Sequence, residues 1–84
     1  MKNRQLQYTI HARDMLAERK IPESWVERTV FEPDSSEEGD EGTTHYIRAI
    51  PEHEGRILRV VLNTKDDVWT VVTLFFDRRL RRKE

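Results

Sequence analysis

Histidine and arginine are the residues of this chain best suited to chemistry on RNA. Cleavage through the 2′-hydroxyl needs a base for that proton, an acid for the leaving oxygen and cations beside the phosphate. His11 and Arg19 would share one side of a helix, about two turns apart, and we predict that both line a catalytic groove. Alternatively, His11 hydrogen-bonds the junction of helix and sheet, and Arg19 pairs with Glu23 or with a carbonyl at a helix end.

A second set of side chains could bind nucleotides. Tyr46 and Arg48 alternate on one face of an expected strand, where a ring could stack on a base and a guanidinium could clamp a phosphate. The alternative is that they form the solvent face of an edge strand. Arg56 begins the next strand, where its head could leave the core and join the catalytic residues. Arg59 belongs to the opposite face of that strand, which we expect to be less buried.

The chain ends on a basic segment. Arg78 and Arg79 follow the last apolar run, and residues 81–83 add three more cations. We predict that Arg78 and Arg79 bind phosphate with a steep salt dependence. The alternatives are a solubilising tail and a partner for the acidic segment 34–41, which would then act as an intramolecular mimic of nucleic acid.

Composition narrows the classes of function. The 84 residues contain no cysteine, so thiolate chemistry and sulfur-bound metals are excluded, and a reducing compartment is expected. His11, His45 and His53 lack the spacing of a metal site. We therefore expect no metal, no cofactor and a cytoplasmic protein. No stretch has the length and apolarity of a membrane span, so no membrane partner is expected.

The net charge of −1 does not exclude RNA as a partner. It is the sum of segments of opposite sign, with eight acidic residues and one basic residue between positions 23 and 42. The rest of the chain is correspondingly basic, which permits a cationic surface despite the acidic isoelectric point.

Two helices are expected in the first part of the chain. Thr9 is a suitable N-cap, and apolar positions recur at helical spacing over about residues 10–19. Pro22 interrupts that pattern and suits the start of a second helix, which should end near Phe31. The first helix would then carry the histidine and arginine proposed for catalysis.

Three strands should follow an acidic linker. Residues 34–43 combine two glycines and two serines with five acids, which predicts a mobile loop. Beyond it the apolar period changes from 3.6 to 2, and segments 44–50, 56–63 and 68–76 are typical of strands. The short connections between them predict an antiparallel meander.

These elements predict a single α+β domain over residues 1–84, with two N-terminal helices packed on an antiparallel sheet of three or four strands in the order ααβββ. A flexible N-terminus at 1–8 and a basic tail at 78–84 would flank it. The expected core draws on both helices and the last two strands: Leu16, Ile21, Trp25, Val26, Val30, Leu58, Val60, Val72, Leu74 and Phe76.

The order and spacing of several motifs resemble one bacterial family. The strings HARDMLAERKIPESWVERTVFEPD, HYIRAIPEHEGRILRVVLN and VWTVVTLFFDRRLRRK are similar to domain-of-unknown-function family 4258 (DUF4258) over almost the whole chain. The matching positions are His11-Ala12, Arg19, Ile21, Gly55-Arg56 and Thr73. Members commonly carry Arg-Met in the first helix, where this chain has Met15-Leu16, so an arginine that contacts phosphate there would be missing.

The family is grouped with RelE-like and BrnT-like ribonuclease toxins, and the resemblance therefore implies a strongly curved RelE-like sheet and a metal-independent ribonuclease. RNA or the ribosome and a cognate antitoxin protein would be its partners. Apolar residues on the second sheet face also suggest a homodimer. Because a fold does not determine a function, the alternative is a non-catalytic binding module for a partner protein or RNA.

Overall fold

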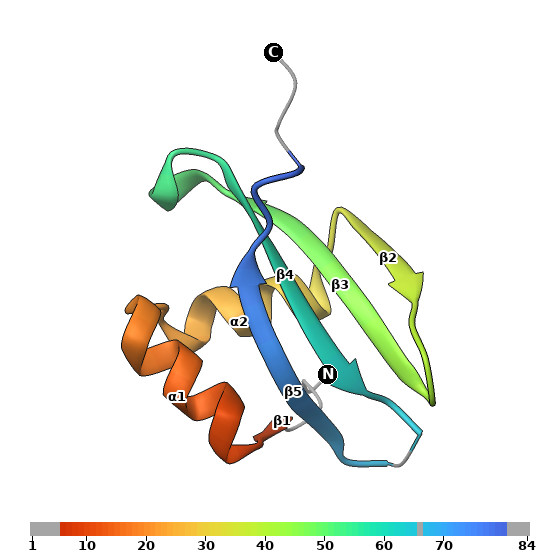
Figure 1. Ribbon diagram of the computed structural model, residues 1–84. Coiled ribbons are helices and arrows are strands. Elements are labelled where there is room, and N and C mark those ends of the chain that lie inside the picture. Colours follow the sequence, from red (N-terminus) through yellow and green to blue (C-terminus); the bar gives the residue numbers. More distant parts are fainter. Residues whose placement is uncertain (1–5, 66, 81–84) are drawn as a thin grey trace.

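The computed structural model of the protein describes residues 6–65 and 67–80 (Figure 1). Its elements, in chain order, are β1 (Leu6–Tyr8), α1 (Ile10–Arg19), α2 (Glu23–Phe31), β2 (Ser35–Glu38), β3 (Thr43–Ile50), the 3-10 turn η1 (Pro51–His53), β4 (Arg56–Asn63) and β5 (Trp69–Phe76). Both helices and the last three strands agree with the predicted ranges to within one residue. Among the described residues, no helix is long and apolar enough to cross a membrane.

The predicted sheet and element order are wrong. The sheet has five strands in the order β1-β5-β4-β3-β2, and β1 runs parallel to β5, so the sheet is mixed and the chain does not begin with its helices. Leu6–Tyr8, which was expected to be flexible, pairs with residues 69–71 of β5. Three residues are too few for an alternating pattern to indicate a strand, although Leu6 and Tyr8 pack against the core.

The acidic segment predicted to be a mobile loop contains the edge strand β2. Its residues pair antiparallel with β3, from Ser35 opposite Ile47 to Glu38 opposite Thr44. All four residues of β2 are exposed, so backbone pairing rather than apolar burial holds the strand. Composition therefore carried no signal for it.

Both helices lie on one face of the sheet and leave the other face without a helix (Figure 1). The core between helices and sheet consists of Ala12, Leu16, Ile21, Val26, Val30, Ile50, Leu58, Val60, Leu62, Val71 and Leu74. Seven of the ten predicted core residues belong to it. Trp25 and Phe76 are only partly buried and pack against its margin.

Val72 was predicted to lie in the core but does not, because a bulge in β5 changes which of its side chains face the helices. Val61 pairs with Thr73, but the next residue, Leu62, pairs with Val71, so Val72 is the extra residue. Beyond the bulge Val71 turns toward the helices and is fully buried.

Thr9 positions the start of α1 against this bulge. As predicted, it is the N-cap: its Oγ1 accepts a hydrogen bond from the Ala12 backbone N–H at 3.0 Å. The same hydroxyl donates to the Val72 carbonyl at 3.0 Å. The first turn of α1, which carries His11, is therefore held beside the middle of β5.

Candidate functional site

The sheet face opposite to the helices, here called the helix-free face, carries a cluster of polar side chains that contact one another. Strand register places three rows across this face. The middle row is Ser35, Ile47, Arg59 and Phe75; the row toward the hairpin tips is Glu37, His45, Val61 and Thr73; the row toward the end of β5 is Ala49, Ile57 and Asp77. In the last row, the Asp77 backbone N–H donates a hydrogen bond to the Ile57 carbonyl at 2.8 Å, which holds Asp77 beside β4.

Arg59 is buried at the centre of this face, with only 8% of its surface exposed. Its Nε donates to Asp77 Oδ2 at 2.9 Å, and its Nη1 donates to His45 Nδ1 at 2.9 Å and lies 3.4 Å from Glu37 Oε1. Nη2 has no hydrogen-bond partner within the described part of the chain. A buried guanidinium needs such partners, because leaving its charge unpaired away from water would be costly.

Asp77 holds two arginines together. Its Oδ2 accepts from Arg59, while Arg79 donates through its backbone N–H to Oδ1 at 3.0 Å, through Nε to Oδ1 and through Nη2 to Oδ2, both at 3.2 Å. The side-chain hydrogen bonds from Arg79 lower the pKa of Asp77 from 3.8 to about 2, although burial opposes this shift. The carboxylate is thus a charged acceptor at neutral pH, and it fixes both guanidinium groups.

His45 and Glu37 complete the cluster around Arg59. A guanidinium can only donate, so Nδ1 of His45 must accept and the ring carries its proton on Nε2. Gly39, in the β2–β3 turn, lies so close that a Cβ there would be 2.8 Å from His45 Nε2. His45 is partly buried, whereas the Glu37 side chain is 62% exposed. We call Arg59, Asp77, Arg79, Glu37 and His45 the Arg59 cluster.

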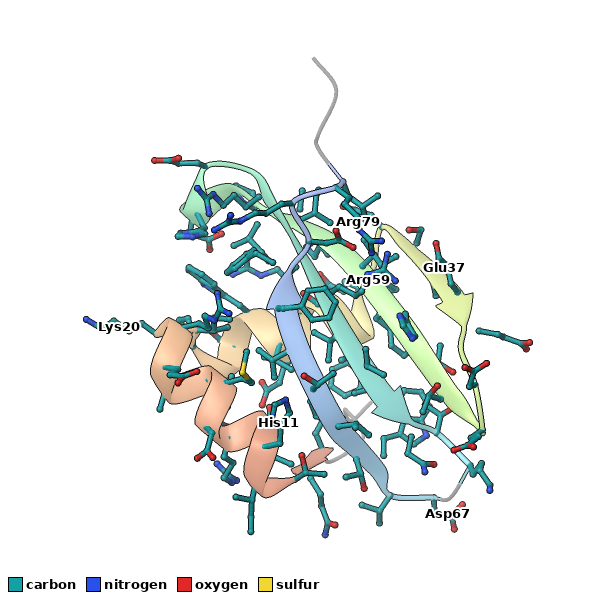
Figure 2. The ribbon with its side chains drawn as sticks, in the orientation of Figure 1. His11, Lys20, Glu37, Arg59, Asp67 and Arg79 are labelled. Atoms are coloured by element: carbon teal, nitrogen blue, oxygen red, sulfur yellow. The ribbon has the colours of Figure 1, made fainter. Side chains whose placement is uncertain are left out.

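His11 lies at the border of the same face. It is exposed in the first turn of α1, and its Nε2 is 3.0 Å from the hydroxyl of Thr73 on β5. Phe75, two residues further along β5, is the cross-strand neighbour of Arg59 and is partly exposed. Figure 2 shows His11 between α1 and β5, with Arg59, Arg79 and Glu37 grouped further along the sheet.

The other two predicted catalytic residues lie away from His11. Arg19 ends α1, about 12 Å further along the helix axis, and makes no hydrogen bond or ion pair in the described part of the chain. Arg56 starts β4 beyond the Ile57–Asp77 row, about 17 Å along the sheet from Thr73. The structure does not bring these three side chains to one phosphate. It does show the alternative role for His11, a hydrogen bond between helix and sheet.

Tyr46 and Arg48 point to the side that the helices cover. Tyr46 stacks on Trp69 with ring centroids 6.0 Å apart. Arg48 donates to the Glu32 carbonyl at the end of α2 and lies 4.0 Å from Asp34. Both side chains thus have structural partners on the face opposite to the Arg59 cluster.

Arg78 and Arg79 are brought to the same end of the sheet as Arg56. All three are exposed and lie next to the Ile57–Asp77 row, Arg56 in β4 and the other two just after β5. The Arg79 side chain is 81% exposed although Asp77 binds its guanidinium. The rest of the predicted basic tail, residues 81–84, lies outside the described part of the chain.

Sequence reasoning missed the centre of the site. Arg59 was assigned to the less buried face, which is the helix-free face, but its burial by Asp77 and Glu37 was not foreseen. An arginine within the β-branched strand RILRVVLN is the one local sign that a buried partner is needed. Finding that partner requires the β4–β5 register. Within residues 6–65 and 67–80, no group of three or more His, Asp or Glu side chains could hold a metal ion.

A family model described as Domain of unknown function (DUF4258) matches residues 8–76, which confirms the family that the motifs indicated. No curated protein and no solved structure matches the chain.

Proposed function

Because the chain belongs to the DUF4258 family, whose description names no activity, we propose a function from its geometry: the helix-free sheet face binds single-stranded RNA. The observation that carries this proposal is the position of Phe75. It lies on β5 between Thr73, which contacts His11, and Asp77, which holds Arg59 and Arg79. An aromatic ring on an open sheet face, with cations beside it, suits an unstacked base and its phosphates.

Two arginines at the end of the sheet would contact the phosphates. Arg78 and Arg79 are exposed beside the last row, so RNA that stacks on Phe75 could extend over them, whereas Arg56 alternates with Leu58 and Val60 on the face that the helices cover. Each is a planar donor that matches phosphate oxygens. No helix within the described part of the chain covers this face, so a strand of RNA would not need to displace one.

The binding test compares two neighbouring phenylalanines on opposite faces of β5. Phe75→Leu keeps an apolar side chain but removes the stacking ring, and we expect RNA affinity to fall at least about fivefold, as for the loss of one base stack. Phe76→Leu is the matched control, because Phe76 packs toward Trp25 and His53. Fluorescence anisotropy with a labelled single-stranded RNA measures both. Equal affinity of the two variants would contradict the proposal.

We further propose that the bound RNA is cleaved without metal, as in a toxin-type ribonuclease of the RelE or BrnT kind, with His11 as the acid–base group. His11 is exposed, and its Nδ1 has no partner among the described residues while Nε2 is near Thr73. The free nitrogen could exchange a proton with a 2′-hydroxyl or a leaving oxygen. Such an enzyme would act on RNA or the ribosome and would have an antitoxin as partner.

The cleavage test uses labelled RNA, alone and with translating ribosomes, without added metal. His11→Gln can still hydrogen-bond Thr73 but cannot titrate, so we expect cleavage to fall by about a hundredfold or more while RNA binding persists. If the wild type binds RNA but cleaves neither substrate, the protein is a binding module. If His11→Gln cleaves like the wild type, the acid–base group is elsewhere.

A further inference from the structure

We propose that Arg59 is a phosphate-binding position that the Glu37 carboxylate occupies in the free protein. RNA would have to displace Glu37 before a phosphate reaches the buried guanidinium, so Glu37 restrains binding. This inference rests on the proposed RNA function and adds the residue that regulates it. It also adds Arg59 itself, which the phosphate contacts proposed above do not include.

The hydrogen bonds of Arg59 divide its guanidinium into a fixed side and an exchangeable side. Nε is bound to Asp77 at 2.9 Å, and the Asp77 side chain is 2% exposed and holds Arg79 as well. On the other side, Nη1 lies 3.4 Å from Glu37 Oε1, and Nη2 has no partner among the residues that the structure describes. Two adjacent N–H groups suit the paired oxygens of a phosphate, and one long contact to a carboxylate uses them only in part.

Glu37 can leave without disrupting the core. Its side chain is 62% exposed, and β2 pairs only with β3 and is exposed along its whole length. A rotation of this side chain into water would break one long ion pair. Asp77 and His45 would still bind the Arg59 guanidinium, so its charge would not be left unpaired.

The charges around Arg59 favour an anion once Glu37 has moved. Arg59 and Arg79 are cations, Asp77 is one anion, and His45 accepts from Arg59 as a neutral ring. With Glu37 in place the cluster is neutral, and without it the cluster carries one positive charge. A phosphate would therefore replace a carboxylate at a position already shaped for an anion.

Inorganic phosphate is the direct probe, followed through the NMR signal of the Arg59 Nε–H group at physiological ionic strength. Glu37→Gln removes the charge, and we expect phosphate affinity to rise about twofold to fivefold. Glu38→Gln is the matched control: Glu38 is the next residue of β2, pairs with Thr44 and lies on the opposite face. It should change the affinity much less, because its side chain lies on the other face of the sheet and salt screens its longer-range interaction with Arg59.

The same variants are then tested with single-stranded RNA, and the two assays separate the two proposals. A rise in RNA affinity with Glu37→Gln but not with Glu38→Gln supports both. Phosphate binding that rises with Glu37→Gln, together with no RNA binding by any variant, would retain the Arg59 site and reject the RNA function. An Arg59 signal that phosphate never shifts, or equal effects of both glutamine variants, would overturn the inference.

Discussion

Arg59 is a charged side chain buried on a sheet face that no helix covers. Its neighbours bury it: Ile47 and Phe75 flank it in the register, and Asp77 satisfies its Nε. Burying an arginine–aspartate pair costs much of the free energy that the attraction between the two charges supplies. Removing one partner is nevertheless destabilising, because it leaves an unpaired buried charge. Asp77 is therefore required for Arg59 to stay in place, and its protonation state should control the stability of this face.

Acid should weaken the protein through Asp77. The pKa of Asp77 is lowered from 3.8 to about 2 in the folded protein, so the unfolded chain binds the proton more tightly. Its contribution to stability is present above about pH 4 and is lost as the pH falls toward 2. Urea unfolding across this range should show the loss in the wild type.

Asp77→Asn should be less stable than the wild type at neutral pH by about 1–3 kcal/mol, because Arg59 then loses its charged acceptor. It should also lose less stability in acid, since the titrating carboxylate is gone. Identical pH dependence of the two proteins would show that Asp77 does not contribute as described.

Alkaline pH should also weaken the protein, through ionisation of Tyr8. Its hydroxyl is buried without a hydrogen-bond partner among residues 6–65 and 67–80, and burial, followed by the charges of Glu23 and Glu27, raises its pKa from 10.0 to about 12. The folded state thus favours the protonated phenol, and stability should be lost as the pH rises through 10 toward 12. In Tyr46→Phe, Tyr8 is the single tyrosine, and its ultraviolet titration should have a midpoint near 12. A midpoint of about 10 in the folded variant would argue against a buried hydroxyl.

At the scale of elements, the junction of α1 with β5 determines where His11 lies. Thr9 caps the helix and bonds the carbonyl of Val72, the residue that the bulge inserts into β5. The bulge and the cap together bring the first turn of α1 beside Thr73. A change in either should therefore affect both the stability of α1 and the position of the histidine.

Thr9→Ala should destabilise the protein by about 1–2 kcal/mol, because it removes the N-cap acceptor and the bond to β5. Thr9→Ser keeps the hydroxyl and should lie close to the wild type. Urea unfolding measures both variants, and the NMR signals of His11 should shift in the alanine variant more than in the serine variant. If alanine is as stable as serine at this position, the hydroxyl does not anchor the helix.

At the scale of the whole molecule, charges of opposite sign are separated in space as well as along the chain. The acids of β2 lie at one edge of the sheet, and Arg56, Arg78 and Arg79 lie at the end where β4 begins and β5 ends. The near-zero net charge hides this arrangement. Association with RNA should therefore depend on salt despite the acidic isoelectric point.

The logarithm of the RNA association constant should fall with the logarithm of salt concentration with a slope of about −1.4, if Arg78 and Arg79 each contact a phosphate of single-stranded RNA. Arg78→Gln should reduce the slope by about 0.7. Lys20→Gln removes the same charge at the far end of α1 (Figure 2) and should leave the slope unchanged. A slope that Arg78→Gln and Lys20→Gln alter equally would indicate general attraction rather than contacts at the basic end.

The sequence alone determined the elements whose patterns are local: both helices, the N-cap at Thr9 and the ranges of β3, β4 and β5, together with the family. It also singled out His11 and Arg79, which lie at the border and at one end of the helix-free face, and their roles stay predictions. Tertiary structure decided the rest. β1 was missed because three residues are too few to show an alternating pattern, and β2 because all four of its residues are exposed. The bulge at Val72 reversed the alternation read from β5. The Arg59 cluster exists only because the β4–β5 register sets Asp77 beside Arg59, 18 residues away in the chain.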